Sequence, residues 1–256
     1  MKRLIFLILA VCGANHVFSQ ESLEFIESVK TAFHPDFFNV NVHMFYSKDN
    51  PLTYSEELES LAEYGNNAAM VYLGDCYLYG EGTDIDYEKA LNWFYRAAMN
   101  GFVPVLNYLG ICYDKGWGVE CDPTQAYRFY KTAAFKGDID GCFNLAVVYR
   151  DGIGTEQDLL RARAWFEKAA EYFPTAQSNV GMLYLYEENY EKAFYWLSKA
   201  SEENLPIACE LLGDCYDNGW GTELDKEKAQ AYYKKSYELG NEHAKTKIIN
   251  YGHKNK

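Results

Sequence analysis

The chain has 256 residues, of which 48% are hydrophobic and 24% charged, a composition typical of a globular protein rather than a disordered one. Its 24 Lys and Arg stand against 37 Asp and Glu, which gives a formal net charge of -13. A protein that binds nucleic acid or anionic lipid neutralises phosphates with clustered cations, so this balance argues against both kinds of partner.

Residues 1–19 have the layout of a secretory signal peptide. Lys2 and Arg3 form a basic start, residues 4–11 are an apolar run, and small and polar residues lead to a cleavage site predicted after Ser19. The run is too short to span a bilayer about 30 Å thick, and no later stretch is apolar enough to do so. An alternative is lipidation of Cys12, but Val11 stands where a lipoprotein site normally has a small residue. We therefore predict an exported protein, periplasmic or secreted.

Residues 20–65 are predicted to form an N-terminal helical cap and loop. Residues 21–33 have the pattern of an amphipathic helix, and residues 34–52 contain two prolines and are expected to be a loop. Residues 55–65 look like the second helix of a repeat that lacks its first helix. A lone helix of this kind covers the end of a stack of helix pairs.

A five-residue pattern recurs along most of the remaining chain. Its full form, LGxCY, occurs three times, and two degenerate copies lie between the second and third. The steps between the glycine positions are 36, 36, 35 and 32 residues, where the positions are 74, 110, 146, 181 and 213. Apolar residues around the pattern have helical spacing, so each copy predicts a first helix with one buried face.

A turn and a second helix follow in each copy. Four copies contain a Gly-x-Gly turn, and glycine ends a helix readily because it adopts positive φ. A residue suited to helix capping then stands four positions before an alanine, which favours an N-cap over a catalytic or metal-binding carboxylate. These residues are Asp86, Asp122, Asp158, Asn189 and Asp225. The fourth copy lacks the Gly-x-Gly turn, so we predict a tighter turn and a local change of curvature there.

The LGxCY pattern, the Gly-x-Gly turn, the D-x-x-x-A helix start and the aromatic–alanine second helix resemble Sel1-like repeats, a variant of the tetratricopeptide arrangement. The resemblance implies an all-α fold, a right-handed α-solenoid of stacked antiparallel helix pairs with about five repeats plus capping helices. We place the solenoid at residues 66–245 and a C-terminal tail at residues 246–256, with a sixth first helix beginning at Asn241.

The cysteines predict at most one disulfide. Cys76, Cys112 and Cys215 occupy a position of the first helix that is apolar in the other copies, so we expect small core residues there. The candidates for a bridge are Cys112 with Cys121, or Cys121 with Cys142. No CxxC occurs, so no zinc site is expected.

The motifs of several enzyme classes are missing from the sequence. There is no HExxH and no GxSxG. Some cysteine-rich relatives of the resembled family are labelled β-lactamase or penicillin-binding, but no serine here has a lysine three residues later and no KTG occurs. We therefore predict a protein that is not an enzyme and has no cofactor, metal or catalytic residue.

In tetratricopeptide-like arrays the first helices line a concave groove, and the resemblance places the partner-binding surface there. Positions three before, one after, and four or five after each glycine are predicted to face this groove. They are Val71, Asp75 and Tyr79; Asn107, Ile111 and Asp114; Phe143, Val147 and Arg150; Ser178, Met182 and Tyr186; and Glu210, Asp214 and Asn218. Acidic residues lie at both ends and apolar residues in the middle.

The leading hypothesis is a non-enzymatic scaffold or adaptor that holds a protein or peptide in this groove after export. The acidic charge predicts a basic partner. One alternative is a β-lactam or cell-wall hydrolase or binding protein, which rests on the family label alone. Another is a structural scaffold that organises an envelope assembly through its opposite face.

Overall fold

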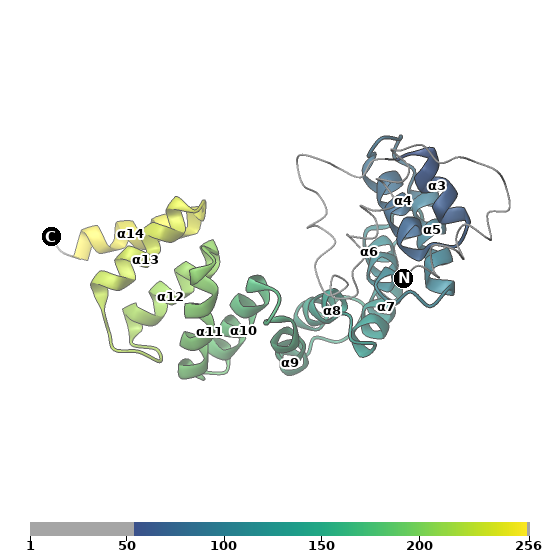
Figure 1. Ribbon diagram of the computed structural model, residues 1–256. Helices are drawn as coiled ribbons and strands as arrows, with labels where there is room; N and C mark the ends of the chain where they lie inside the picture. Colours follow the sequence, from purple (N-terminus) through teal and green to yellow (C-terminus); the bar gives the residue numbers. More distant parts are fainter. Residues whose placement is uncertain (1–53, 255–256) are drawn as a thin grey trace, which may run out of the picture. The chain divides into compact units, whose positions relative to one another are not determined.

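The computed structural model describes residues 54–254, and all regular secondary structure in this range is α-helical (Figure 1). The predicted signal peptide and the predicted helix at residues 21–33 lie outside the described residues. In chain order the helices are α3 (Glu56–Glu63), α4 (Asn67–Tyr79), α5 (Tyr87–Met99), α6 (Val105–Lys115), α7 (Pro123–Phe135), α8 (Ile139–Asp151), α9 (Leu159–Ala169), α10 (Pro174–Tyr186), α11 (Tyr190–Glu202), α12 (Pro206–Asn218), α13 (Lys226–Glu238) and α14 (Glu242–Lys254).

Helices that are neighbours in sequence pack against each other in space. Five pairs, α4–α5 through α12–α13, are the five repeats, and each second helix also contacts the first helix of the next pair. The lone helix α3 packs on α4, and α14 packs on α13. This is the all-helical solenoid that the repeat pattern predicts, in which each unit buries its apolar face against its neighbours.

The predicted helix ends are confirmed by the backbone and its capping side chains. Each of the five predicted N-cap residues accepts a hydrogen bond from the backbone N–H three residues later, at 2.9 to 3.4 Å; they are Asp86, Asp122, Asp158, Asn189 and Asp225. The first helices of the four Gly-x-Gly copies end at a glycine in the left-handed conformation, with φ of 70° to 76°. These ends are local features, which is why the sequence could predict them.

Removal of one N-cap should have a modest effect. Asp122→Ala deprives the Gln125 N–H of its acceptor, so we expect the free energy of unfolding to fall by about 1 kcal/mol. Asp122→Asn keeps an acceptor oxygen and is the matched control, with a change of a few tenths of a kcal/mol at most. Urea unfolding of both variants would check this, and equal losses would show that the cap is not the cause.

In four of the five first helices, an interior glycine makes room for a side chain of the second helix. A Cβ at Gly74 would lie 2.3 Å from the Phe94 ring, and one at Gly213 would lie 2.6 Å from the Tyr233 ring. Glycine in a helix interior costs about 1 kcal/mol relative to alanine, and the close packing of a buried ring offsets that cost. This glycine therefore allows the two helices of its repeat to pack closely.

The second glycine of each Gly-x-Gly turn has a role that the sequence did not predict. A Cβ at Gly118, Gly154 or Gly221 would lie 2.0 to 2.3 Å from a carbonyl oxygen at the start of the preceding repeat's second helix. The turn of one repeat therefore lies directly on the previous repeat. In two copies the tryptophan between the glycines also stacks on the first residue of that helix, Trp117 on Tyr87 and Trp220 on Tyr190.

The fourth repeat has the short turn that its sequence predicts. Only residues 187–189 separate α10 from α11, and Glu188 has φ of 58°. Where the other repeats place a glycine, this turn places Glu187, whose Oε1 lies 2.8 Å from Arg163 Nε of α9. The contact with the preceding repeat is thus ionic here. The predicted change of curvature stays a prediction.

The C-terminal end differs from the predicted tail at residues 246–256. Helix α14 continues to Lys254, because it packs on α13 as an incomplete sixth repeat.

The three cysteines considered for a disulfide, Cys112, Cys121 and Cys142, are free thiols. Cys112 and Cys142 are buried in the core, whereas Cys121 is exposed.

Candidate interaction surface

Side chains of successive first helices contact one another across the repeats. Asn144 Nδ2 of α8 donates to Asn107 Oδ1 of α6 at 2.7 Å, and Arg150 Nη1 of α8 donates to Asn179 Oδ1 of α10 at 2.7 Å. Asn144 and Asn179 stand two positions before the glycine position of their repeats, which is not among the positions predicted to face the groove. The asparagine at this position in the third and fourth repeats is the sequence feature that could have indicated a surface role for it.

The fifteen predicted groove residues differ in how accessible they are. Tyr79, Met182, Tyr186 and Asn218 are exposed, and seven others are half-buried: Asn107, Ile111, Asp114, Phe143, Val147, Arg150 and Asp214. Val71, Asp75, Ser178 and Glu210 are buried. Three of these four stand three positions before the glycine, so this position lies within the helix packing and not at an open surface.

Phe143 is less available as an anchor than its position suggests. Its ring contacts the rings of Phe166 and Phe173, with centroid separations of 5.4 and 5.7 Å. It therefore belongs largely to the core between the third and fourth repeats. The most exposed apolar side chain of the predicted surface is Tyr186, at 74%, with Met182 one helical turn before it on α10.

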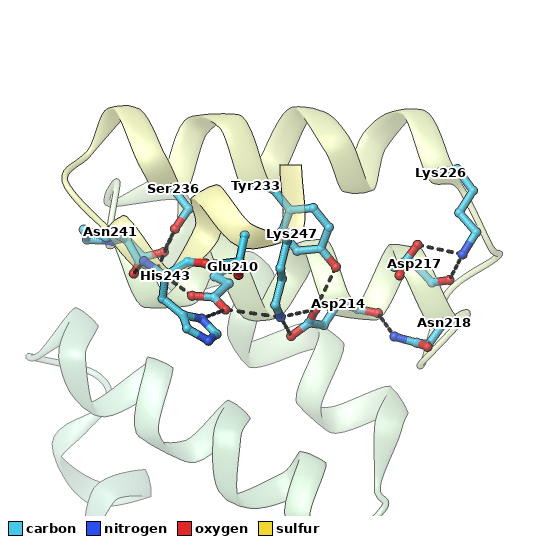
Figure 2. Close-up of polar contacts among 12 residues, drawn as sticks. Glu210, Asp214, Asp217, Asn218, Lys226, Tyr233, Ser236, Asn241, His243 and Lys247 are labelled. Atoms are coloured by element: carbon cyan, nitrogen blue, oxygen red, sulfur yellow. Dashed lines mark hydrogen bonds and ion pairs between the residues drawn. The ribbon is translucent and has the colours of Figure 1, made fainter. Parts of the chain in front are cut away.

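The acidic residues at the C-terminal end are bound by the chain's own last helix (Figure 2). Lys247 Nζ of α14 lies 2.5 Å from both carboxylate oxygens of Asp214 and 3.2 Å from Glu210 Oε1. Asn241 Nδ2 donates to Glu210 Oε2 at 2.5 Å, and His243 Nδ1 lies 2.6 Å from Glu210 Oε1. Tyr233 Oη donates to Asp214 at 2.7 Å.

These contacts change the electrostatics of that end. Burial alone would raise the pKa of Glu210, but the hydrogen bonds from Asn241, His243 and Lys247 outweigh it, and the pKa lies below its ordinary value. Glu210 is thus an ionised carboxylate, and both Glu210 and Asp214 are paired with Lys247. They are not the free acidic rim that we expected to attract a basic partner.

Asp75, at the other end, has a different environment. It is only 3% exposed and accepts one long hydrogen bond, from Tyr108 Oη at 3.3 Å. Its other oxygen, Oδ1, is buried and has no hydrogen-bond partner among the described residues. Leaving a buried polar group unpaired costs about 1 to 3 kcal/mol, so the fold tolerates a destabilising group here.

The pH dependence of stability should reveal this carboxyl group. Burial raises the pKa of Asp75 well above its ordinary 3.8, and the hydrogen bond from Tyr108 only partly opposes this. The folded state therefore binds the proton more tightly than the unfolded state, and this group removes stability as the pH rises above 3.8. Asp75→Asn cannot ionise, so its free energy of unfolding should exceed that of the wild type by an amount that grows as the pH rises above about 4.

Denaturant unfolding at several pH values would measure this difference, with the exposed Asp84→Asn as control. A difference between Asp75→Asn and the wild type that stays constant across this range would contradict the assignment.

The described residues include an open pocket but no cluster of side chains that could hold a metal ion. No group of three or more His, Cys, Asp or Glu in residues 54–254 could hold a metal ion. An open pocket of about 640 Å³ lies where the short turn of the fourth repeat meets the Gly-x-Gly turn of the fifth repeat, and its lining includes Glu187, Glu188, Glu191 and Thr222. Glu187 is already paired with Arg163, and no histidine or cysteine is among the residues that line the pocket.

Comparison with known proteins decides the family. A family model described as the Sel1 repeat matches residues 67–102, 104–138, 139–171, 174–205 and 206–241, five copies that coincide with the five helix pairs. The chain belongs to the Sel1 repeat family. Sel1 repeats generally act as scaffolds for protein–protein interaction rather than as enzymes.

Solved structures and a curated relative agree with this family. A Sel1 repeat protein from Oxalobacter formigenes has a TM-score of 0.68 and 27% identity, covering 75% of this chain and 82% of the other. A protective antigen of uropathogenic Escherichia coli with an SLR fold has a TM-score of 0.70 and 29% identity, covering 87% of this chain and 50% of the other.

An uncharacterised Sel1-like repeat-containing protein of Schizosaccharomyces pombe is 37% identical over 65 residues, which is 25% of this chain. The matched stretch spans only 10% of that relative's length. Among the described Sel1 helices, none is both long enough and apolar enough to cross a membrane.

Proposed function

We propose that this protein is a non-enzymatic scaffold that binds a protein or peptide partner along its first-helix face after export. The observation that carries the proposal is the set of side-chain hydrogen bonds between successive first helices. They join α4 to α6, α6 to α8 and α8 to α10, so that these four helices form one continuous surface. Solenoids use such extended surfaces to hold partners. The signal-peptide layout of residues 1–19 supports export, and the net charge of -13 supports a partner with a basic region.

The centre of the binding surface is placed on α10. Tyr186 and Met182 are exposed there, and Arg150 of α8 lies beside Asn179 of the same helix. A large aromatic with a flexible apolar neighbour and a nearby arginine is the composition of protein-binding hot spots. The paired acids Glu210 and Asp214 contribute less, because Lys247 already forms ion pairs with both.

Site-specific photo-cross-linking would test the proposal. A photoreactive phenylalanine analogue would replace Tyr186 on the first-helix face, and in a matched protein it would replace Tyr195 on the second helix α11. Both tyrosines are well exposed, at 74% and 59%. The full chain would be expressed in its own host, and cross-linked proteins would be identified by mass spectrometry.

We expect the same partner to be captured repeatedly from position 186 and not from position 195. Met182→Ser with Tyr186→Ser should weaken its binding by about tenfold or more, because anchors of this kind are each worth 1 kcal/mol or more. Capture from position 195 alone would contradict groove binding and support a scaffold that uses the opposite face. Absence of any captured protein from either position would contradict the scaffold role.

A further inference from the structure

Asp75 and Asp214 hold equivalent places in the first and fifth repeats. Each follows the glycine of an LGDCY sequence, and each of those glycines packs against a ring of the second helix, Phe94 or Tyr233. Asp214 has two kinds of donor. Tyr233, nineteen residues later, donates through its hydroxyl, and Lys247, thirty-three residues later, donates through its ammonium group.

Both donors are replaced at Asp75. The residue nineteen positions later is Phe94, which has no hydroxyl, and the residue thirty-three positions later is Tyr108, which supplies one hydrogen bond at 3.3 Å. The chain therefore builds the same carboxylate site twice and fills it with an ammonium group only once. Asp75 Oδ1 is left without a hydrogen-bond partner among the described residues because no ammonium group is supplied there.

An ammonium group is the kind of donor that Asp75 lacks. Its Oδ1 has no hydrogen-bond partner among the described residues, and an opposite charge beside a carboxylate stabilises the ionised form. At the filled site, Lys247 Nζ also lies 5.3 Å from the centroid of the Tyr233 ring, and the ring at the corresponding position beside Asp75 is that of Phe94.

We propose that Asp75 is a receptor for the ammonium group of a lysine on the bound partner, in the place that Lys247 occupies at Asp214. The inference rests on the proposed function and deepens it, because it names the partner chemistry that one part of the surface recognises. It also explains why one oxygen of a buried carboxylate has no donor in the first repeat. A lysine that enters pairs with Oδ1 and completes its hydrogen bonding.

The test uses n-butylammonium chloride, which has the head group and stem of lysine. The full mature chain, labelled with ¹³C at aspartate carboxyl carbons, would be titrated at mildly alkaline pH and followed by NMR. The Asp75 signal is assigned by its absence from the Asp75→Asn variant. We expect a saturable shift of this signal with n-butylammonium, and none with tetramethylammonium, which has the charge but no N–H donor.

Lys247→Ala provides a positive control for the probe, because it empties the equivalent site at Asp214. A shift of the Asp214 signal in that variant, with no shift of the Asp75 signal, would overturn the proposal. A second variant, Phe94→Tyr with Tyr108→Lys, installs both missing donors within the chain. We expect it to melt at a higher temperature than the wild type and to lose the shift of Asp75.

The outcome is separable from that of the proposed function. A partner that cross-links from position 186, with an Asp75 signal that ignores n-butylammonium, would leave the scaffold role in place and refute the lysine receptor. A shift of Asp75 without any cross-linked partner would contradict the scaffold role and leave Asp75 as an ammonium site without an assigned partner.

Discussion

Gly154→Ala should lower the free energy of unfolding by about 3 kcal/mol or more, the largest effect that we expect from a single methyl group in this protein. Two causes act together. Gly154 has φ of 68°, which costs a residue with a Cβ about 1 to 2 kcal/mol. The new Cβ would also lie 2.0 Å from the carbonyl oxygen of Pro123, and backbone must shift to relieve that contact, at about 1 to 3 kcal/mol.

Gly137→Ala separates these two causes. Gly137 has φ of 89°, but a Cβ there meets nothing within 4 Å, so only the conformational cost of about 1 to 2 kcal/mol applies. Urea unfolding of both variants would measure the difference. Hydrogen exchange should locate the extra loss for Gly154→Ala at the boundary of the second and third repeats, and equal losses would show that the contact between repeats is unimportant.

Lys247→Ala should destabilise the C-terminal helices by about 2 kcal/mol, through the loss of one ammonium group that serves two carboxylates. Removing one partner of a buried ion pair costs about 3 to 5 kcal/mol, but the Lys247 side chain here is 25% exposed, so solvent reduces the loss. Lys234→Ala is the control: its pair with Glu238 spans 3.7 Å and its side chain is 71% exposed, so we expect a change within about 0.5 kcal/mol.

The effect of Lys247→Ala should depend on pH with a defined sign. The pKa of Glu210 lies below its ordinary 4.5, so its contribution to stability is fully present above that pH and is lost as the pH falls through the folded-state value. The gap between wild type and Lys247→Ala should therefore narrow in acid. Hydrogen exchange in α14 at two pH values would check this, and a gap that widens in acid would contradict the role of the carboxylates.

Much of the fold follows from short stretches of sequence. The period of about 36 residues, the N-cap residues such as Asp122 and the helix-ending glycines such as Gly116 act on hydrogen bonds within three or four residues. Interactions of that range depend little on the rest of the chain, so the sequence predicted the helix pairs and their ends. The glycine opposite Phe94 was also predictable, because both residues lie within one repeat.

The candidate surface was predicted less well, because its character depends on how one repeat lies on the next. From the sequence we expected Glu210 and Asp214 at an open acidic end of the surface, whereas Lys247, more than thirty residues away, forms ion pairs with both. It treated Asp75 as equivalent to Asp214, yet only the packing of α4 and α6 leaves one oxygen of Asp75 without a donor.

The second glycine of the turns shows the same division. Its positive φ is a local property, and the sequence by itself identified the turn. Only the tertiary structure shows that a Cβ at Gly154 would clash with the preceding repeat. The distance from Gly154 to Pro123 depends on the position of every helix between them. Local hydrogen bonding determines where the helices begin and end. The packing of each repeat against the next determines which side chains of the helices remain free to bind a partner.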